Sequence, residues 1–242
     1  MKILGLDSSG IVASVAIVED ENLIAEYTVN YKKTHSQTLL PMLDELVKMT
    51  ELDLDTIDAI AVAAGPGSFT GLRIGSATAK GLGLALKKPL VEIPTVDALA
   101  YNLYDSRALI CPIMDARRSQ VYTGIYRFQE HKLVTVEAQM AVPMAEMIEK
   151  LNARGEEVVF LGDGVPVFGK MIQENLKVPY SFAPAHVNKQ RAAAVAAPGE
   201  IYVKEGKIVT AMEHVPEYLR VSQAERERAQ KLQEEKASEK NS

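Results

Sequence analysis

The chain has 242 residues, 47% of them hydrophobic and 24% charged, which is the composition of a globular protein with one or two domains and excludes a disordered or fibrous chain. The formal net charge of −5 argues against a free-standing nucleic-acid binder. The single cysteine, Cys111, excludes an intramolecular disulfide and a multi-thiolate zinc site, which fits a cytoplasmic protein. No apolar run reaches the roughly 18 residues of a membrane span, and the N-terminus reads as a strand rather than a signal peptide.

The first hundred residues alternate between strand-like and helix-like segments. Three β-rich runs separated by polar turns predict an antiparallel meander over 3–6, 12–18 and 23–31. Apolar residues at helical spacing then predict a helix over about 39–47, which either begins near Leu40 or is kinked at Pro41. The remaining segments of this half are a strand at 57–64, a helix to about 86, a strand at 89–93 and a helix at 95–104.

The second half partly repeats this order. Its predicted elements are strands at 108–114, 120–128 and 133–137, a helix at 143–152, a strand at 158–161, and helices at 165–176 and 188–204. Element order alone therefore predicts two related α/β halves joined near Asp105. We expect an N-terminal subdomain that carries the dimerisation surface, a smaller second subdomain, a return segment and a charged tail, over 1–104, 105–205, 206–221 and 222–242. The mixed charges of the tail are typical of a frayed helix or a disordered segment.

The helix that follows the Gly-Pro-Gly loop carries a stripe of small residues. Gly71, Gly75, Ala79 and Gly83 recur every fourth position and so share one face. An interior glycine costs a helix roughly 1 kcal/mol relative to alanine, so the stripe needs a packing reason. That reason is either packing within this chain or a partner helix across a subunit interface. We expect the interface, with apolar contacts from Leu39, Leu43, Leu46, Leu72 and Leu82.

Polar turns follow the first strand of each half. Asp7 and Asp115 each end a strand, so two acidic strand ends would face each other across a cleft, as in sugar kinases and actin-like ATPases. The simpler alternative for the Asp7 turn is a plain hairpin with an Asx turn. The Gly65–Gly71 loop is a separate candidate anion site, because it leads into a helix N-terminus with unpaired N–H groups, and its alternative is a tight strand-to-helix connection. The candidate nucleotide or phosphate cleft comprises Asp7, Ser8, Ser9, Asp115, Arg117, Arg118, Gly162 and Gly164.

Two arginines of this candidate cleft stand where phosphate-wrapping loops have small residues. Arg117 and Arg118 could bind phosphate or RNA, or could form ion pairs that close the cleft, and we favour the ion pairs. The four histidines are isolated and match no metal-binding spacing, so each is expected on the surface or in a loop.

Several motifs along the chain occur together: Leu4–Ser9, His35-Ser36 with Leu39–Pro41, Gly65–Gly75, Asp115–Arg118 with Val121-Tyr122, and Pro216 with Tyr218–Arg220. In combination they resemble the TsaB family, also called YeaZ, of bacterial tRNA threonylcarbamoyladenosine biosynthesis proteins. The resemblance covers residues 1 to about 220. It implies a duplicated RNase H-like α/β fold of the actin-like ATPase (ASKHA) class, with two mixed-sheet subdomains.

The same resemblance implies kinship with the catalytic subunit TsaD, which holds its metal through the two histidines of a His-Leu-Glu-Gly-His motif. Aligning Ala79–Leu82 and Pro89-Leu90 with TsaD puts Thr95 and Leu99 at the two ligand positions. Threonine is a poor metal ligand and leucine is none, so we expect neither a metal nor another cofactor, and no catalytic residue.

The function implied by the resemblance is that of a non-catalytic subunit. It would form a heterodimer with TsaD, work with the P-loop ATPase TsaE, and meet tRNA through that complex. The complex moves threonylcarbamoyl from its adenylate to N6 of the adenosine beside the anticodon. Alone, the chain is expected to form a homodimer. The alternatives are a peptidase, an actin-like ATPase, or a self-dimer used for storage or regulation.

Overall fold

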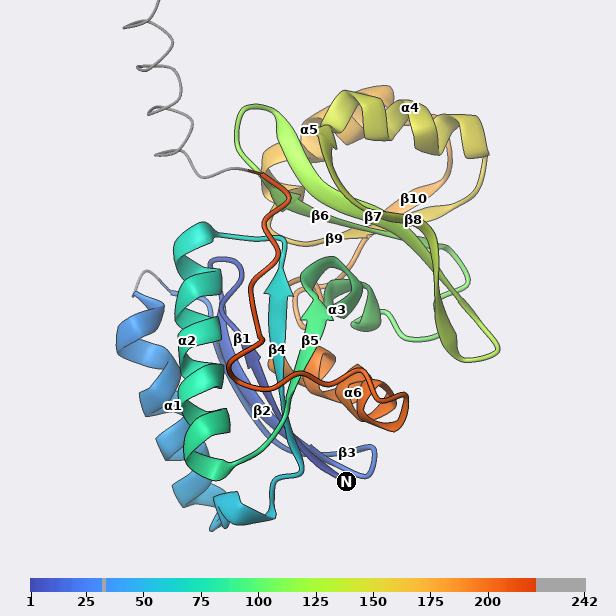
Figure 1. Cartoon of the computed structure of the whole chain (residues 1–242). Helices are drawn as coiled ribbons and strands as arrows, with labels where there is room; N and C mark the ends of the chain where they lie inside the picture. The colour runs from blue at the N-terminus through green and yellow to red at the C-terminus, as the bar shows by residue number, and fades with distance from the viewer. Residues whose placement is uncertain (32–33, 221–242) are drawn as a thin grey trace, which may run out of the picture.

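The computed structural model describes residues 1–31 and 34–220, and shows two lobes, each built on a five-stranded mixed sheet (Figure 1). The first sheet has the order β3-β2-β1-β4-β5 and consists of β1 (Lys2–Asp7), β2 (Ala13–Glu19), β3 (Asn22–Val29), β4 (Ala59–Gly65) and β5 (Leu90–Pro94). β1, β2 and β3 form the predicted antiparallel meander, and β4 and β5 continue the sheet in parallel. The tail expected over 222–242 lies outside the described residues.

The second sheet repeats the connectivity of the first. Its order, β10-β9-β6-β7-β8, is built from β6 (Leu109–Asp115), β7 (Gln120–Gln129), β8 (Lys132–Pro143), β9 (Val158–Leu161) and β10 (Tyr180–Phe182). Again the first three strands are antiparallel and the last two are parallel. The duplicated RNase H-like architecture is therefore confirmed. The sequence patterns missed β10 and gave β8 less than half of its length.

Helices cover both faces of the first sheet and the outer face of the second. α1 (His35–Thr50) and α2 (Phe69–Leu86) lie on one face of the first sheet, and α6 (Ala192–Lys204) lies on the other. α4 (Met144–Arg154) and α5 (Val165–Asn175) pack on the second sheet, and a short 3-10 turn spans Leu54–Thr56. α1 begins at His35 and contains Pro41. None of the helices in the described part of the chain combines the length and hydropathy that a membrane crossing needs.

The last helix corrects the predicted subdomain boundaries. The sequence placed 192–205 in the second subdomain, whereas α6 packs against the first sheet. Gly5 of β1 has no room for a β-carbon because the Ala192 carbonyl oxygen occupies that space, and Gly199 faces Ala61 and Ile3. The chain therefore returns to the first lobe after it has built the second.

A buried apolar seam joins the two lobes on one side. α3 (Thr95–Tyr101) follows β5 of the first sheet and packs against β6 and β7 of the second. We call this contact the α3 seam; its buried members include Val96, Leu99, Ala100, Ile110, Met114 and Tyr126. The Tyr126 hydroxyl donates a hydrogen bond of 2.7 Å to Asp97, which adds a polar link between the lobes.

Candidate functional site

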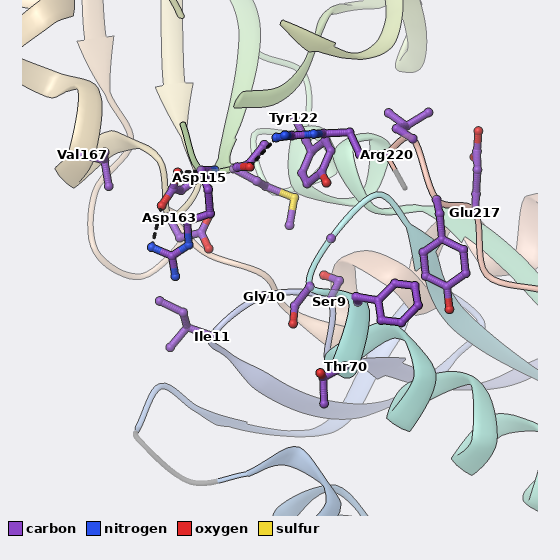
Figure 2. A pocket seen from close by; sticks show the side chains of 18 residues that line it. Ser9, Gly10, Ile11, Thr70, Asp115, Tyr122, Asp163, Val167, Glu217 and Arg220 are labelled. Atoms are coloured by element: carbon purple, nitrogen blue, oxygen red, sulfur yellow. Dashed lines mark hydrogen bonds and ion pairs between the residues drawn. The ribbon is translucent and has the colours of Figure 1, made fainter. Parts of the chain in front are cut away.

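A cavity of about 550 Å³ lies between the lobes and borders the α3 seam, with which it shares Met114 (Figure 2). Its walls are the turns that follow β1, β4, β6 and β9, together with residues 217–220. The lining residues are Ser9, Gly10, Ile11, Gly67, Ser68, Phe69, Thr70, Met114, Asp115, Ala116, Arg117, Tyr122, Asp163, Val167, Glu217, Tyr218, Leu219 and Arg220. The structure thus brings together the two strand ends that the sequence predicted to face each other.

Asp7 lies beneath the cavity floor and does not line it. Its carboxylate accepts hydrogen bonds from the backbone N–H and the hydroxyl of Ser9, at 2.8 and 2.6 Å, in an Asx turn. Burial raises the pKa of Asp7 to about 6, and the two bonds from Ser9 oppose that shift. His35 is not a free surface side chain, because its Nε2 lies 2.8 Å from the carbonyl oxygen of Gly10 in the same loop.

The opposite wall is formed by Asp115 and Asp163. The Asp115 backbone N–H donates to Asp163 at 3.3 Å, and burial raises the pKa of Asp163 above its usual value. Gly162 and Gly164 do not line the cavity. They let their turn pass against the backbone of Ile113, since a β-carbon at Gly162 would overlap the Ile113 carbonyl oxygen. Both glycines therefore position Asp163, which the sequence analysis did not select although it lies between them.

The arginine pair does not close the cleft. Arg117 forms an ion pair of 3.1 Å with Asp115 of its own turn, and its side chain is otherwise exposed. Arg118 is exposed and does not line the cavity. The expected closing interaction comes instead from Arg220, whose Nη1 donates to the Ala116 carbonyl oxygen at 2.6 Å. A same-turn carboxylate is the nearer partner for Arg117, so the ion pair forms within one lobe.

The small-residue stripe of α2 faces inward, which corrects the predicted interface. A β-carbon at Gly71 would overlap the Ser8 carbonyl oxygen, and one at Gly75 would lie 2.6 Å from the Ser8 hydroxyl. Ser8 in turn donates to the Gly71 carbonyl oxygen at 2.8 Å. The remaining predicted interface residues are buried in, or packed against, the first lobe's own core: Leu39, Leu43, Leu46, Leu72, Ala79, Leu82 and Gly83. The stripe lets α2 approach the β1 turn closely, so packing within the chain is its explanation.

The C-terminal residues are the part of the site that sequence reasoning missed. Glu217, Tyr218, Leu219 and Arg220 line the cavity, and the Tyr218 ring packs on Phe69 with centroids 4.7 Å apart. The sequence motif around Pro216 pointed to these residues. Its spacing does not predict, however, that this segment packs against the β4–α2 loop, which lies some 150 residues earlier in the chain.

The residues at the aligned metal-ligand positions do not fit a metal. Thr95 and Leu99 are both buried on α3, and Leu99 belongs to the α3 seam. The Thr95 hydroxyl has no hydrogen-bond partner. Leu99, one helical turn later, has no atom that could bind a metal, so Thr95 would lack a second metal ligand at the aligned positions. Among residues 1–31 and 34–220, no three His, Cys, Asp or Glu side chains are grouped as a metal site would require.

Two repeated mixed sheets around an interlobe cavity define a two-lobed protein of the actin-like ATPase fold class. The family model described as TsaD, tRNA N6-adenosine threonylcarbamoyltransferase, matches residues 22–228. The chain is also 34% identical over 225 residues to the tRNA threonylcarbamoyladenosine biosynthesis protein TsaB of Bacillus subtilis, covering 93% of this chain and 96% of that protein. TsaB of Escherichia coli is 30% identical over 167 residues, 68% of this chain and 72% of that one.

A solved structure agrees with these sequence relationships. YeaZ from Pseudomonas aeruginosa superposes with a TM-score of 0.77 at 26% identity, covering 90% of this chain and 99% of that chain. The chain therefore belongs to the TsaB (YeaZ) proteins within the wider TsaD family. This confirms the resemblance inferred from the motifs.

Proposed function

We propose that this chain is a non-catalytic subunit of the machinery that makes threonylcarbamoyladenosine in tRNA. It binds TsaD as a heterodimer and holds that enzyme in an active state, together with TsaE. TsaD then transfers threonylcarbamoyl from its adenylate to N6 of the adenosine beside the anticodon, and tRNA is met through the complex. The observation that carries the proposal is the burial of Thr95 and Leu99 on α3, at the two positions that the resemblance aligns with the metal ligands of TsaD.

The chemistry of the described residues also favours a supporting role over a peptidase. Cys111 is buried, and burial raises the pKa of its thiol to about 12, which disfavours the nucleophilic thiolate. The Ser9 hydroxyl donates to Asp7, a carboxylate that sits below the cavity floor. Neither side chain is paired with a histidine that could act as its base.

The outer faces of α1 and α2 are the surface that we assign to the TsaD contact. Leu40 and Met49 on α1 are 52% and 76% exposed, and Leu84 on α2 is 59% exposed. Ala77 and Gly81 lie exposed on α2 and would let a partner helix come close. Exposed apolar side chains on two adjacent helices suit burial against another apolar helix pair, and the homodimer would use the same surface.

The proposal is tested by reconstitution from purified parts. The chain is combined with TsaD and TsaE of the same organism, tRNA, ATP and threonylcarbamoyl-AMP, and the modified nucleoside is measured by mass spectrometry. We expect product when all three proteins are present, and none from this chain alone or from TsaD and TsaE without it. Full product without this chain, or product from it alone, would contradict the proposal.

A further inference from the structure

Residues 206–220, the C-terminal strap, leave the end of α6 and run along the first lobe to the mouth of the interlobe cavity (Figure 1). The strap is fastened first to β5. Val209 and Leu90 exchange two backbone hydrogen bonds of 2.9 Å. Further along, the fully buried His214 ring places Nδ1 at 2.6 Å from the Glu92 carboxylate, which also accepts from the backbone N–H of Val215.

At the cavity mouth the strap is fastened to the loop between β4 and α2. The Glu217 backbone N–H donates to the Ala64 carbonyl oxygen at 2.7 Å. Gly65 has a φ of +125°, and the Glu217 carbonyl oxygen occupies the space that a β-carbon would need there. The Tyr218 ring then packs on Phe69, whose other neighbour is the Arg73 guanidinium, 3.9 Å from the ring centroid. The first lobe therefore has a complementary packing site for the strap, formed by Ala64, Gly65 and Phe69, which we call the seat.

The end of the strap crosses to the second lobe. Arg220 donates to the carbonyl oxygen of Ala116 after β6, at 2.6 Å (Figure 2). Gln139 of β8 donates to the Glu217 carboxylate at 2.7 Å. Within 1–31 and 34–220, no hydrogen bond or ion pair joins the 7–11 and 65–70 loops of the first lobe directly to the second lobe. The strap thus bridges the lobes at the mouth of the cavity, while the buried α3 seam joins them deeper in the interface.

We propose that the C-terminal strap is a clamp that sets the angle between the lobes and so the width of the cavity, with the α3 seam as the pivot. The difference between the two interlobe contacts carries this inference. The seam is a packed apolar core that resists separation but permits a small rotation, whereas the mouth depends on two side-chain hydrogen bonds that can be broken without exposing a core. The clamp is a property of the chain itself and does not depend on the proposed function.

The test measures the distance between the lobes with two spin labels, on Gln37→Cys of α1 and Lys170→Cys of α5. Both native side chains are exposed, and the buried Cys111 stays unlabelled. Labelled protein is diluted with excess unlabelled protein so that only intramolecular distances are recorded. The clamp variant is Gln139→Ala with Arg220→Ala, which cuts both anchors on the second lobe and leaves the seat on the first lobe intact.

We expect the clamp variant to give a longer and broader distance distribution than the parent, with its thermal transition retained. Met212→Ala is the matched control, since Met212 belongs to the strap and is 79% exposed; a second control ends the chain at Arg220. Both controls should keep the parental distribution. If the double variant fails to fold, Tyr218→Leu, which removes the ring contact with Phe69 at the cavity mouth, takes its place with the same expectation. An unchanged distribution in a folded clamp variant would overturn the proposal.

Discussion

Asp7 is an acidic side chain that is almost completely buried and has donors from one residue, Ser9. Because burial raises its pKa from 3.8 to about 6, the folded protein holds this proton more tightly than the unfolded chain does. Well below pH 3.8 Asp7 is protonated in both states, and it contributes no ionisation cost to folding. Stability falls as the pH rises from about 4 to 6, and above pH 6 the full cost is present. This rise in the pKa of Asp7 corresponds to a loss of about 3 kcal/mol in the free energy of unfolding once the carboxyl is ionised.

Asp7→Asn should therefore stabilise the fold in a pH-dependent way. The amide oxygen can still accept from Ser9, while the buried charge is removed. We expect the free energy of unfolding at pH 7.5 to rise by up to about 3 kcal/mol, and the gain to fall below about 1 kcal/mol at pH 4. Urea unfolding at both pH values measures this.

The control for this prediction is Asp44→Asn, which neutralises an exposed carboxylate on α1. It should change stability by less than about 1 kcal/mol, as exposed ion pairs usually do. If Asp7→Asn shifted stability equally at pH 4 and pH 7.5, its effect would not come from the buried charge.

At the scale of elements, α2 offers a matched pair of glycines. Gly71 faces the backbone of Ser8 with no room for a β-carbon, whereas a β-carbon at Gly81 would meet nothing within 4 Å. Gly71→Ala should lower the free energy of unfolding by about 1–3 kcal/mol because α2 must move away from the β1 turn. Gly81→Ala should raise it by roughly 1 kcal/mol, the usual gain in an exposed helix interior.

Thermal unfolding of the two alanine variants compares the faces directly, since each carries the same chemical change in the same helix. Equal effects at both positions would mean that the stripe does not face the β1 turn.

The spacing of apolar residues predicted most of the helices and strands, because burial of one face repeats apolar residues every 3.6 positions in a helix and every 2 positions in a strand. The stripe on α2 was also visible, yet spacing alone cannot say whether a small face meets a strand turn or another subunit. The strand β10 was missed because three residues carry too little pattern. α6 was assigned to the wrong lobe because its packing on β1 joins residues almost 190 positions apart. The duplicated element order was enough to predict that the turns after Asp7 and Asp115 meet at one cleft. The strap was missed because it reaches that cleft from residues far away along the chain.

At the scale of the whole molecule, a substitution on the outer face of α2 should change association with the partner, whereas one on its inner face should change the stability of the fold. Leu84→Glu places a charge on the exposed outer face. It should weaken binding to TsaD at least tenfold, because the charge would be desolvated in the complex, while the thermal transition stays within a few degrees. Calorimetric titration with TsaD measures the affinity.

The inward-facing counterpart is Ala79→Leu. Ala79 is fully buried against the first lobe's core, so overpacking should lower the free energy of unfolding by about 1–3 kcal/mol. Denaturant unfolding measures this loss, and the variant that remains folded should still bind TsaD. Unchanged binding by Leu84→Glu would place the partner surface elsewhere than on the outer faces of α1 and α2.

The return of α6 to the first sheet has a consequence for synthesis on the ribosome. Ile3, Ala61 and Ile93 lie on the face of the first sheet that Val195 and Ala196 of α6 cover, and translation makes α6 only after the whole second lobe. The first lobe, although its strands emerge first, therefore keeps an uncovered apolar face while about a hundred further residues are made. The strands and outer helices of the second lobe are continuous in the chain. We therefore expect the second lobe to finish folding first, and the first lobe to finish only when α6 has been made and covers its sheet.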